Sequence, residues 1–497
     1  MTTNFWSVFS LLLYLFYLGL AIYFVIDLLF KRHNPIKSLS WIVVLIAFPY
    51  VGLVLYMYFG RNFRKTKMYS RKGLHDERLK REISADQVAL IAAESEDVNF
   101  PEALRSQKKL VLLGLNNSHS LLTQKNKAQL YFTGKDALDA MFACASQAEE
   151  TIHLQSFIIE NDSIGTKWKN LLVKKALEGV DVRVIYDDFG SWSLPRKYLK
   201  ALRQAGVQAI PFGKVRFPGF KAMLNYRNHR KLLIVDDKVG FLGGVNIADR
   251  YFDGGDSVEW RDTHMRIEGE AVAQIQSSFL MDWYFITHKN LRSRRKRRKK
   301  MVQEPQPVKS IQADETCFMQ IVSSGPDSDW ADIMQLYLTI INQAKSRISL
   351  ITPYFIPNES IMDALRTASL GGVDVRVLIP EKGDSTFVHA ATQSFISYLL
   401  DAGIHVYMYT KGFVHSKVIS IDGECCLIGS ANLDNRSLEH HFEIGAMVYD
   451  AQISRQIEER FDKDLQYSNF IQKKQWNKRP LLKRVGEGLA RLLSPLL

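Results

Sequence analysis

The sequence predicts an α/β protein in which two repeated β-α-β sandwich domains form one composite site, preceded by a two-helix transmembrane hairpin. Three observations support this prediction. Short runs rich in Val and Ile alternate with helix-length amphipathic segments, which is typical of β-α-β units with a mainly parallel sheet. The same order of segments occurs twice, with offsets of 186 to 197 residues. Two long uncharged apolar runs lie near the N-terminus.

Length and composition allow several units. A chain of 497 residues with 46% hydrophobic residues is long enough for two or more domains with ample cores. The expected division is two transmembrane helices in residues 1–60 (about 5–27 and 39–59), a basic juxtamembrane connector at 61–125, a first domain at 126–288, a basic linker at 289–313, a second domain at 314–470 and a C-terminal amphipathic tail at 471–497.

Both N-terminal apolar runs are long enough to cross a bilayer. Phe5–Ile26 and Leu39–Phe59 carry no charge, and a hydrocarbon core of about 30 Å needs about 20 helical residues. A cleaved signal peptide is the alternative for the first run, but a basic start and a small-residue cleavage site are missing. We therefore expect two retained helices. Pro49 would kink the second helix or let it lie partly in the interface.

Basic residues flanking the two runs predict the orientation. The stretch after the second run carries six, and the turn between the runs carries three. They are Arg61, Arg64, Lys65, Lys67, Arg71 and Lys72 against Lys31, Arg32 and Lys37. Because cytoplasmic segments are enriched in Lys and Arg, we expect the large C-terminal part on the cytoplasmic side.

Each repeat begins with strand-length apolar runs separated by a helical stretch. The first pair is Ile152–Phe157 and Val180–Val184, and the second is Ile348–Tyr354 and Val373–Val377. A further helical stretch and then a short polar signature follow in both repeats.

The signature reads H-x-K-x4-D-x6-G-[GS]-x-N in both copies, 186 residues apart. Its members are His229, Lys231, Asp236 and Asn246 in the first copy and His415, Lys417, Asp422 and Asn432 in the second. We predict strands at Lys231–Asp236 and Lys417–Asp422. Side chains two apart on a strand share a face, so each His and Lys would point the same way.

Two such signatures together suit phosphoryl transfer. One neutral imidazole attacks phosphorus and forms a phospho-histidine, while the other protonates the leaving oxygen and later deprotonates the incoming hydroxyl. Lys231, Lys417, Asn246 and Asn432 would hold the nonbridging oxygens. Because two ammonium groups supply the positive charge, we expect no metal ion and no other cofactor.

Other polar residues around the signatures are candidates for supporting tasks. Asp262 and Glu443, downstream of each copy, are candidates to fix the imidazole tautomers. We group Asp236 and Asp422 with the catalytic set, although their place at strand ends also suits local structure. Two alternatives, a phosphate contact and a salt bridge, stay open for Arg250 and Arg436. Four histidines have no repeated partner and are interpreted as ordinary polar or packed residues: His264, His389, His440 and His441.

The four cysteines, the basic run at 289–300 and the C-terminal tail are not among the signature residues. None of the four cysteines has C-x-x-C spacing, and Cys425 and Cys426 are expected to be buried strand residues. Residues 289–300 hold nine of the basic residues behind the net charge of +13, as a solvated linker that could also attract anionic lipid headgroups. In the tail, Leu482 to Leu492 place apolar residues on one helix face, which fits either an interfacial helix or packing on the protein body.

The paired signature resembles the phospholipase D superfamily, and the whole chain resembles the bacterial cardiolipin synthases. The likeness rests on the two-helix N-terminus, the Gly243-Gly-Val-Asn246 end of the first copy and Ala431-Asn-Leu-Asp-Asn-Arg-Ser437 in the second. Gly244 departs from the common Gly-Ser form in a way typical of this branch. The resemblance implies two phospholipase D-like domains and transfer of a phosphatidyl group between two phosphatidylglycerol molecules, giving cardiolipin and glycerol.

The resemblance also implies partners and a location. Phosphatidylglycerol, other anionic lipids and the membrane are the expected partners, a homodimer is compatible with the sequence, and nucleic acid is not expected. The location would be the bacterial cell membrane, as a multi-pass protein. Rival functions are a phospholipase D, a phosphatidylserine synthase-type transferase, and a non-catalytic scaffold that binds anionic lipid. Both His-Lys-Asp sets are intact, which argues against the scaffold.

Overall fold

The computed structural model describes residues 2–30, 35–57, 75–93, 101–214, 226–254, 259–288, 317–328 and 330–494. The chain divides into two compact units, one of residues 1–63 with 216–225 and one of residues 64–215 with 226–497. Both repeats belong to the second unit. Most of the basic turn, the basic stretch after the second apolar run and the basic linker lie outside the described residues. The orientation and the role of the linker therefore stay predictions.

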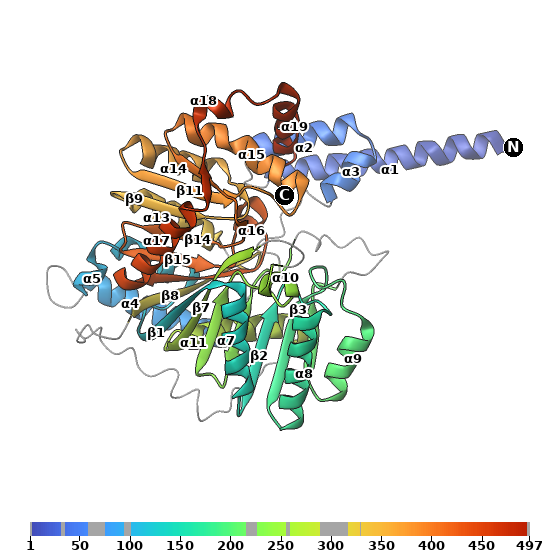
Figure 1. Ribbon diagram of the computed structural model, residues 1–497. Coiled ribbons are helices and arrows are strands. Elements are labelled where there is room, and N and C mark those ends of the chain that lie inside the picture. The colour runs from blue at the N-terminus through green and yellow to red at the C-terminus, as the bar shows by residue number, and fades with distance from the viewer. Residues whose placement is uncertain are drawn as a thin grey trace. The chain divides into compact units, whose positions relative to one another are not determined.

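The N-terminal unit contains one long apolar helix and a second, interrupted one. Helix α1 spans Thr2–Phe30, and its Trp6–Phe30 part is long and apolar enough to cross a membrane (Figure 1). The second apolar run forms α2 (Pro35–Ala47) and α3 (Val51–Leu55) with a turn between them. The single helix predicted over about 39–59 is replaced by two short ones, and the break falls at Pro49, where the sequence predicted a kink. Pro49 lacks an N–H donor, and Tyr50 turns the chain with φ 63°.

The second unit is built on one mixed sheet. In the described part of the chain it has sixteen strands, in the order β18-β12-β11-β9-β14-β15-β17-β8-β1-β7-β6-β5-β2-β3-β4, with β13 paired to β7. The first repeat supplies β1 Thr123–Thr133, β2 Thr151–Ser156, β3 Asp181–Asp187, β4 Gln208–Phe212, β5 Leu232–Val235, β6 Val239–Gly243 and β7 Glu259–Gly269. The second supplies β8 Cys317–Ser324, β9 Arg347–Ile351, β11 Asp374–Pro380, β12 His405–Tyr409, β13 Gly412–Val414, β14 Val418–Ile421, β15 Cys425–Gly429, β17 Glu443–Tyr449 and β18 Ser468–Phe470. A separate two-stranded sheet pairs β10 (Phe355–Ile356) with β16 (Leu433–Asp434).

The two repeats meet in the middle of the large sheet. Strands β1 and β8, which open the two repeats, pair antiparallel, with Asn126 opposite Cys317. Outward from this seam the order β7-β6-β5-β2-β3-β4 on one side matches β17-β15-β14-β9-β11-β12 on the other. The repeat that the sequence shows is therefore a repeat of strand order, and both copies share one sheet.

The predicted mainly parallel sheet is wrong for the strands that carry the signatures. The runs β2-β3-β4 and β9-β11-β12 are parallel, but β5, β6 and β7 pair antiparallel, as do β14, β15 and β17. The cause is a tight turn. The N–H of Lys238 donates to the Val235 carbonyl at 3.0 Å, and Asp236 and Asp237 between them have φ of 53° and 54°. Such a turn joins strands as an antiparallel hairpin.

Helices cover the sheet on both faces. The helices of the first repeat are α7 (Gly134–Ser146), α8 (Ser163–Leu177), α9 (Arg196–Gln204), α10 (Asp249–Phe252) and α11 (Val272–Thr287). Phe241 packs in one core cluster with α7 and α8, whereas its neighbour Gly240 faces Ile275 of α11. Since neighbouring residues of a strand point to opposite faces, α11 lies across the sheet from α7 and α8.

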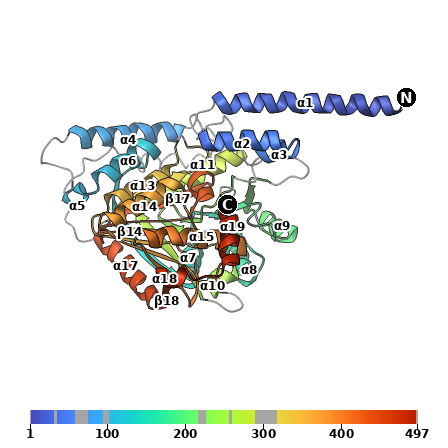
Figure 2. The same ribbon diagram turned by 90° about the horizontal axis from the view of Figure 1, so that it is seen from above.

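The remaining helices complete the second unit. They are α4 (His75–Ala93), α5 (Glu102–Arg105), α6 (Lys108–Ser118), α13 (Asp332–Gln343), α14 (Glu359–Leu370), α15 (Thr386–Asp401), α16 (Asn435–Glu439), α17 (Ala451–Leu465), α18 (Lys473–Trp476) and α19 (Leu481–Leu492). Helices α13 and α14 lie side by side in both views (Figures 1 and 2). The second core cluster joins α6, α13 and α14 to the strands. Cys425 and Cys426 are buried on β15, which confirms the prediction for this pair.

Candidate active site

The signature residues lie at the starts of two equivalent strands. Strand β5 begins one residue after Lys231, and β14 begins one residue after Lys417, so both predicted strands start slightly too early. Both lysines fold back on their own segment. Lys231 Nζ donates to the carbonyl oxygen of His229 at 2.6 Å, and Lys417 Nζ donates likewise to that of His415. All four side chains are buried.

One cavity of about 470 Å³ is lined by both signature histidines. It lies within the second unit and takes residues from both repeats. The polar residues in its wall include His229, Asn246, Arg250, Asp384, His415, Asn432, Asp434, Arg436 and His441. The structure thus brings the two signatures, 186 residues apart in sequence, to one site.

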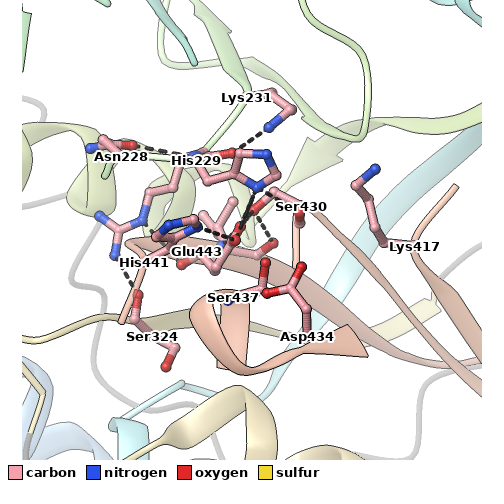
Figure 3. A network of polar contacts seen from close by, with 12 residues as sticks. Asn228, His229, Lys231, Ser324, Lys417, Ser430, Asp434, Ser437, His441 and Glu443 are labelled. Atoms are coloured by element: carbon pink, nitrogen blue, oxygen red, sulfur yellow. Dashed lines mark hydrogen bonds and ion pairs between the residues drawn. The ribbon is translucent and has the colours of Figure 1, made fainter. Parts of the chain in front are cut away.

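Each histidine is held by a carboxylate from the opposite repeat. His229 Nδ1 lies 2.9 Å from Glu443 Oε1 (Figure 3). In the other pair, His415 Nδ1 lies 2.7 Å from Asp262 Oδ2. A carboxylate only accepts, so each Nδ1–H donates and each Nε2 is left for chemistry. The sequence pointed to these two carboxylates without saying which histidine each would hold. Because each histidine is hydrogen-bonded to a carboxylate of the other repeat, both repeats are needed to build either half of the site.

Backbone contacts impose the crossing. Strand β13, just before His415, runs parallel to β7 of the first repeat, and the N–H of His415 donates to the Arg261 carbonyl at 2.7 Å. On the other side the N–H of His229 donates to the Phe442 carbonyl at 2.9 Å. Each histidine is therefore attached to the strand that carries its partner carboxylate.

Burial and charge set the protonation of the pairs. Burial alone would raise the pKa of Glu443, but the adjoining His229 and the Lys231 ammonium lower it to about 2. Burial lowers the pKa of His229, although Glu443 opposes the shift. Burial, together with the charges of Lys417 and Lys231, holds the pKa of His415 well below its usual range. These shifts favour a neutral ring near pH 7, as the nucleophile requires, whereas the ring that protonates the leaving oxygen must carry a second proton on Nε2.

The charged forms of Lys231 and Lys417 are disfavoured in the ligand-free site. Burial lowers the pKa of Lys231 to about 7 and that of Lys417 to about 8, although Glu443 and Asp262 oppose both shifts. Repulsion from Lys417 adds to the lowering at Lys231. Figure 3 shows the two lysines approaching from ribbons of different repeats. Buried cations of this kind gain most from an incoming anion, because water does not screen the attraction.

The Gly-Gly departure at Gly244 has a steric cause. A Cβ at this position would lie 2.0 Å from Asp262 Oδ1. In the second repeat the equivalent Ser430 donates its hydroxyl to Glu443, and in the first repeat the N–H of Thr263 donates to Asp262 at 2.7 Å instead. The serine hydroxyl thus holds the carboxylate, and the glycine gives the carboxylate room.

The signature aspartates lie apart from the cavity. Lys231 and Asp236 are separated by strand β5, roughly 16 Å at about 3.3 Å per residue. The Asp236 carboxylate accepts backbone N–H bonds from three consecutive residues, 149 to 151, at 2.7 to 2.9 Å. Asp422 does the same for residues 345 to 347, at 2.8 to 2.9 Å. These placements do not support their grouping with the catalytic residues; each aspartate joins its hairpin turn to the start of a parallel strand.

Asp236→Ala should therefore lower stability more than catalysis. Losing three charge-assisted bonds at a carboxylate that is 7% exposed is expected to reduce the free energy of unfolding by about 2 kcal/mol. Urea unfolding and kcat, measured below the transition, check this. An unchanged stability with a loss of kcat as large as that of a signature histidine variant would assign Asp236 to the chemistry instead.

The amides and arginines of the cavity are partly engaged. Asn246 donates from Nδ2 to the Tyr251 hydroxyl at 2.7 Å, which leaves one amide hydrogen for a ligand. Asn432 lines the cavity beside Asp434. Arg250 forms an ion pair with Glu160 at 3.0 Å while also lining the cavity. The salt-bridge alternative thus holds for Arg250, and Arg436 lines the cavity half-buried.

His441 is the residue that sequence reasoning missed. It lines the cavity, its ring lies 5.8 Å from that of His229, and its Nδ1 is 3.8 Å from Glu443 Oε1. Its counterpart is Trp260, whose ring lies 5.3 Å from His415. Each stands two residues before the carboxylate of its strand, and this shared spacing is the signal that could have found them.

One group of side chains in the site also has the spacing of metal ligands. Ligand atoms of His229, His441 and Glu443 all lie within 4.8 Å of one another. However, His229 Nδ1 is engaged with Glu443 and with the Ser430 carbonyl at 3.0 Å. Lys231 adds positive charge that disfavours a cation there. We therefore interpret these three side chains as part of the network of hydrogen bonds and charges around His229.

Comparisons with known proteins agree with this site. The family described as "Cardiolipin synthase, PLD-like domain" matches residues 141–283 and 337–465, and "Phospholipase_D-nuclease N-terminal" matches residues 19–61. The cardiolipin synthase of Geobacillus sp. (strain WCH70) is 37% identical and covers 95% of this chain and 91% of its own. The major cardiolipin synthase ClsA of Bacillus subtilis (strain 168) is 38% identical over 99% of this chain and 100% of its own.

A solved structure shares the fold. The phosphatidylserine synthase of Haemophilus influenzae Rd KW20 matches with a TM-score of 0.58 at 15% identity, covering 80% of this chain and 100% of that one. The repeated strand order, the two signatures in one cavity and the relatives over nearly the full length lead to one conclusion. The chain belongs to the cardiolipin synthase family of the phospholipase D superfamily.

Proposed function

We propose that the protein is a cardiolipin synthase, which transfers a phosphatidyl group from one phosphatidylglycerol to another and releases glycerol. The observation that carries this proposal is the crossed pairing of His229 with Glu443 and of His415 with Asp262 around one cavity. Two imidazoles held by Nδ1 present two Nε2 atoms to the same substrate. The relatives named as cardiolipin synthases supply the reaction class.

In the first half-reaction one Nε2 attacks the phosphorus of the donor lipid. A nitrogen–phosphorus bond forms and the bond from phosphorus to the glycerol headgroup oxygen breaks. The other histidine, which starts as an imidazolium with a proton on Nε2, gives that proton to the departing oxygen. Lys231 and Lys417 face the nonbridging oxygens as negative charge spreads over them. The carboxylate behind the attacking ring stabilises its new positive charge.

In the second half-reaction a hydroxyl of another phosphatidylglycerol attacks the phosphatidyl-histidine. The histidine that gave its proton now takes the hydroxyl proton, the oxygen–phosphorus bond forms and the nitrogen–phosphorus bond breaks. Proton and charge thus return to their starting positions. The geometry serves both half-reactions with the same groups, and either histidine can take either task.

The membrane setting completes the proposal. Helix α1 anchors the chain, and α2 with α3 forms a second, broken passage or a partly interfacial segment. We propose that the catalytic unit lies on the cytoplasmic side, because the stretch after these helices is rich in Lys and Arg. Diacyl substrates would then stay in the bilayer while their phosphates enter the cavity.

Product analysis tests the function. Purified full-length protein in phosphatidylglycerol vesicles is expected to form cardiolipin and glycerol in equal amounts. Formation of phosphatidic acid without cardiolipin would replace the synthase by a hydrolase of the same chemistry. If no lipid product formed, the proposed function would be wrong.

The buried lysines predict a pH dependence. Lys231 and Lys417, with pKa values of about 7 and about 8, are ammonium groups below these values and lose their charge as the pH rises through them. Because a phosphodiester anion binds the charged form, KM should begin to rise above about pH 7 as Lys231 loses its charge, and more steeply above about pH 8 as Lys417 does. The rise should be roughly tenfold per pH unit for each lysine that must be reprotonated. Initial rates from about pH 6 to about pH 9 check this. A KM that stays flat over this range would contradict the role of the lysines.

A further inference from the structure

Helix α19 packs on the protein by one face. Ala490 is 2% exposed and lies in a buried cluster with Ile356 and Ala391. Glu487, one turn earlier, is also buried and accepts from Arg479 at 2.8 Å. Figures 1 and 2 both show α19 beside α15. The C-terminal tail therefore forms a helix that packs on the protein body, which was one of the two alternatives expected from the sequence.

The opposite face of α19 is apolar and exposed. Leu482 is 87% exposed, and four further aliphatic side chains are 51 to 73% exposed: Leu481, Val485, Leu489 and Leu492. Their spacing puts them on one stripe of the helix, turned away from Ala490. Single exposed leucines are ordinary, but a continuous stripe on one helix marks a contact surface. We call these five residues the leucine face.

Basic residues border the leucine face. Residues 478–492 contain five Lys or Arg and one acid, Glu487. Arg484 and Arg491, seven residues apart, lie on the same flank of the helix between the packed face and the leucine face. With Arg479 and Tyr398 they line a hollow of about 210 Å³ between α15 and α19, which also contains Asp401 and Glu487. The border thus carries a net positive charge.

The same helix touches the wall of the active-site cavity. Ile356 and Val388 line that cavity, and both pack in the cluster that contains Ala490. Val388 lies in the first turn of α15, just after Asp384, another cavity residue. The residues on which α19 packs therefore also form one side of the cavity.

We propose that the leucine face of α19 inserts into the interface of an anionic bilayer, with the arginines of its border against lipid phosphates, so that the cavity is held at the lipid surface. The charge pattern favours this occupant. Leucines flanked by cations suit acyl chains flanked by anionic headgroups, whereas a second copy would place like charges against each other. The inference rests on the proposed function, because it assumes that the substrate is a bilayer phospholipid.

The test compares two forms of one substrate. The full-length double variant Leu482→Glu/Leu489→Glu is assayed on phosphatidylglycerol vesicles and on a short-chain phosphatidylglycerol below its micelle concentration. The matched control is Leu177→Glu/Leu370→Glu, which changes leucines that are 73% and 71% exposed at the ends of α8 and α14. We expect the α19 variant to lose at least about tenfold on vesicles but less than about twofold on the soluble substrate, since tenfold corresponds to about 1.4 kcal/mol of lost interface binding. The control should keep both activities.

Three outcomes would overturn the proposal. One is an unchanged rate on vesicles, and another is an equal loss on both substrates, which would place the damage in the cavity wall. The third is a change of oligomeric state by light scattering in the α19 variant, which would assign the face to a second copy.

A second readout does not depend on turnover. A polarity-sensitive fluorophore on Leu489→Cys in the reconstituted full chain should shift to the blue in phosphatidylglycerol vesicles, whereas one on Leu370→Cys should not. If the wild type turned over neither substrate, the proposed function would fail while this shift still decided the role of α19. Equal emission at both positions would exclude insertion.

Discussion

Replacing His229 or His415 by alanine is expected to lower kcat for cardiolipin formation by about 10⁴-fold or more, because one loses the nucleophile and the other the proton donor. Both rings line the cavity. His405→Ala is the matched control, since this ring is 48% exposed on β12 and hydrogen-bonds Asp374. Full activity in either signature variant would refute the mechanism.

The same two variants can show which histidine attacks. A phosphatidyl ester with a nitrophenolate leaving group needs no proton on departure, so the variant that lacks the proton donor should release nitrophenol at a substantial rate. The variant that lacks the nucleophile should stay inactive on this ester. Equal failure of both variants would mean that both rings are required before the bond to the leaving group breaks.

Glu443→Gln and Asp262→Asn should each disable the histidine of the opposite repeat. An amide can donate to Nδ1, which stabilises the tautomer with its proton on Nε2 and removes the ionic partner of the charged ring. We expect kcat to fall by roughly 10² to 10⁴-fold. Glu268→Gln, a half-exposed change on the same strand as Asp262, should keep its activity.

Histidine nitrogen NMR would test the crossing itself. Glu443→Gln should change the tautomer of His229 and leave that of His415, and Asp262→Asn should do the reverse. A change at His415 in the Glu443 variant would mean that each carboxylate serves its own repeat, contrary to the contacts at 2.9 Å and 2.7 Å.

Much of the fold could be predicted because apolar periodicity reports burial. The runs at Ile152, Val180 and Ile348 became β2, β3 and β9, all with buried interiors. Strand direction could not be predicted in the same way. It depends on the turn at Asp236 and Asp237, where two positive φ angles close a hairpin that the neighbouring apolar runs do not reveal. Pro49 did predict a kink in the second apolar run, but the full break, with the positive φ at Tyr50, is a local backbone event that the run does not reveal.

The candidate site was predictable as far as its residue types repeat. His229 and His415 share one cavity, and Asp262 and Glu443 approach them, because the repeated spacing reflects repeated geometry. The crossing depends on which backbone segment pairs with which strand, a long-range choice with no local signature. His441 was missed for a related reason, since its counterpart in the first repeat is a tryptophan.

The central claim is that one composite site forms a covalent phosphatidyl-histidine. The most direct measurement is to mix the full-length protein with phosphatidylglycerol labelled at phosphorus, stop the reaction within one turnover under alkaline conditions, and map the label by mass spectrometry. The account predicts label on His229 or His415, with none formed in the Ala variant of the labelled residue. Label on any other residue, His441 included, or turnover without any covalent label, would contradict it.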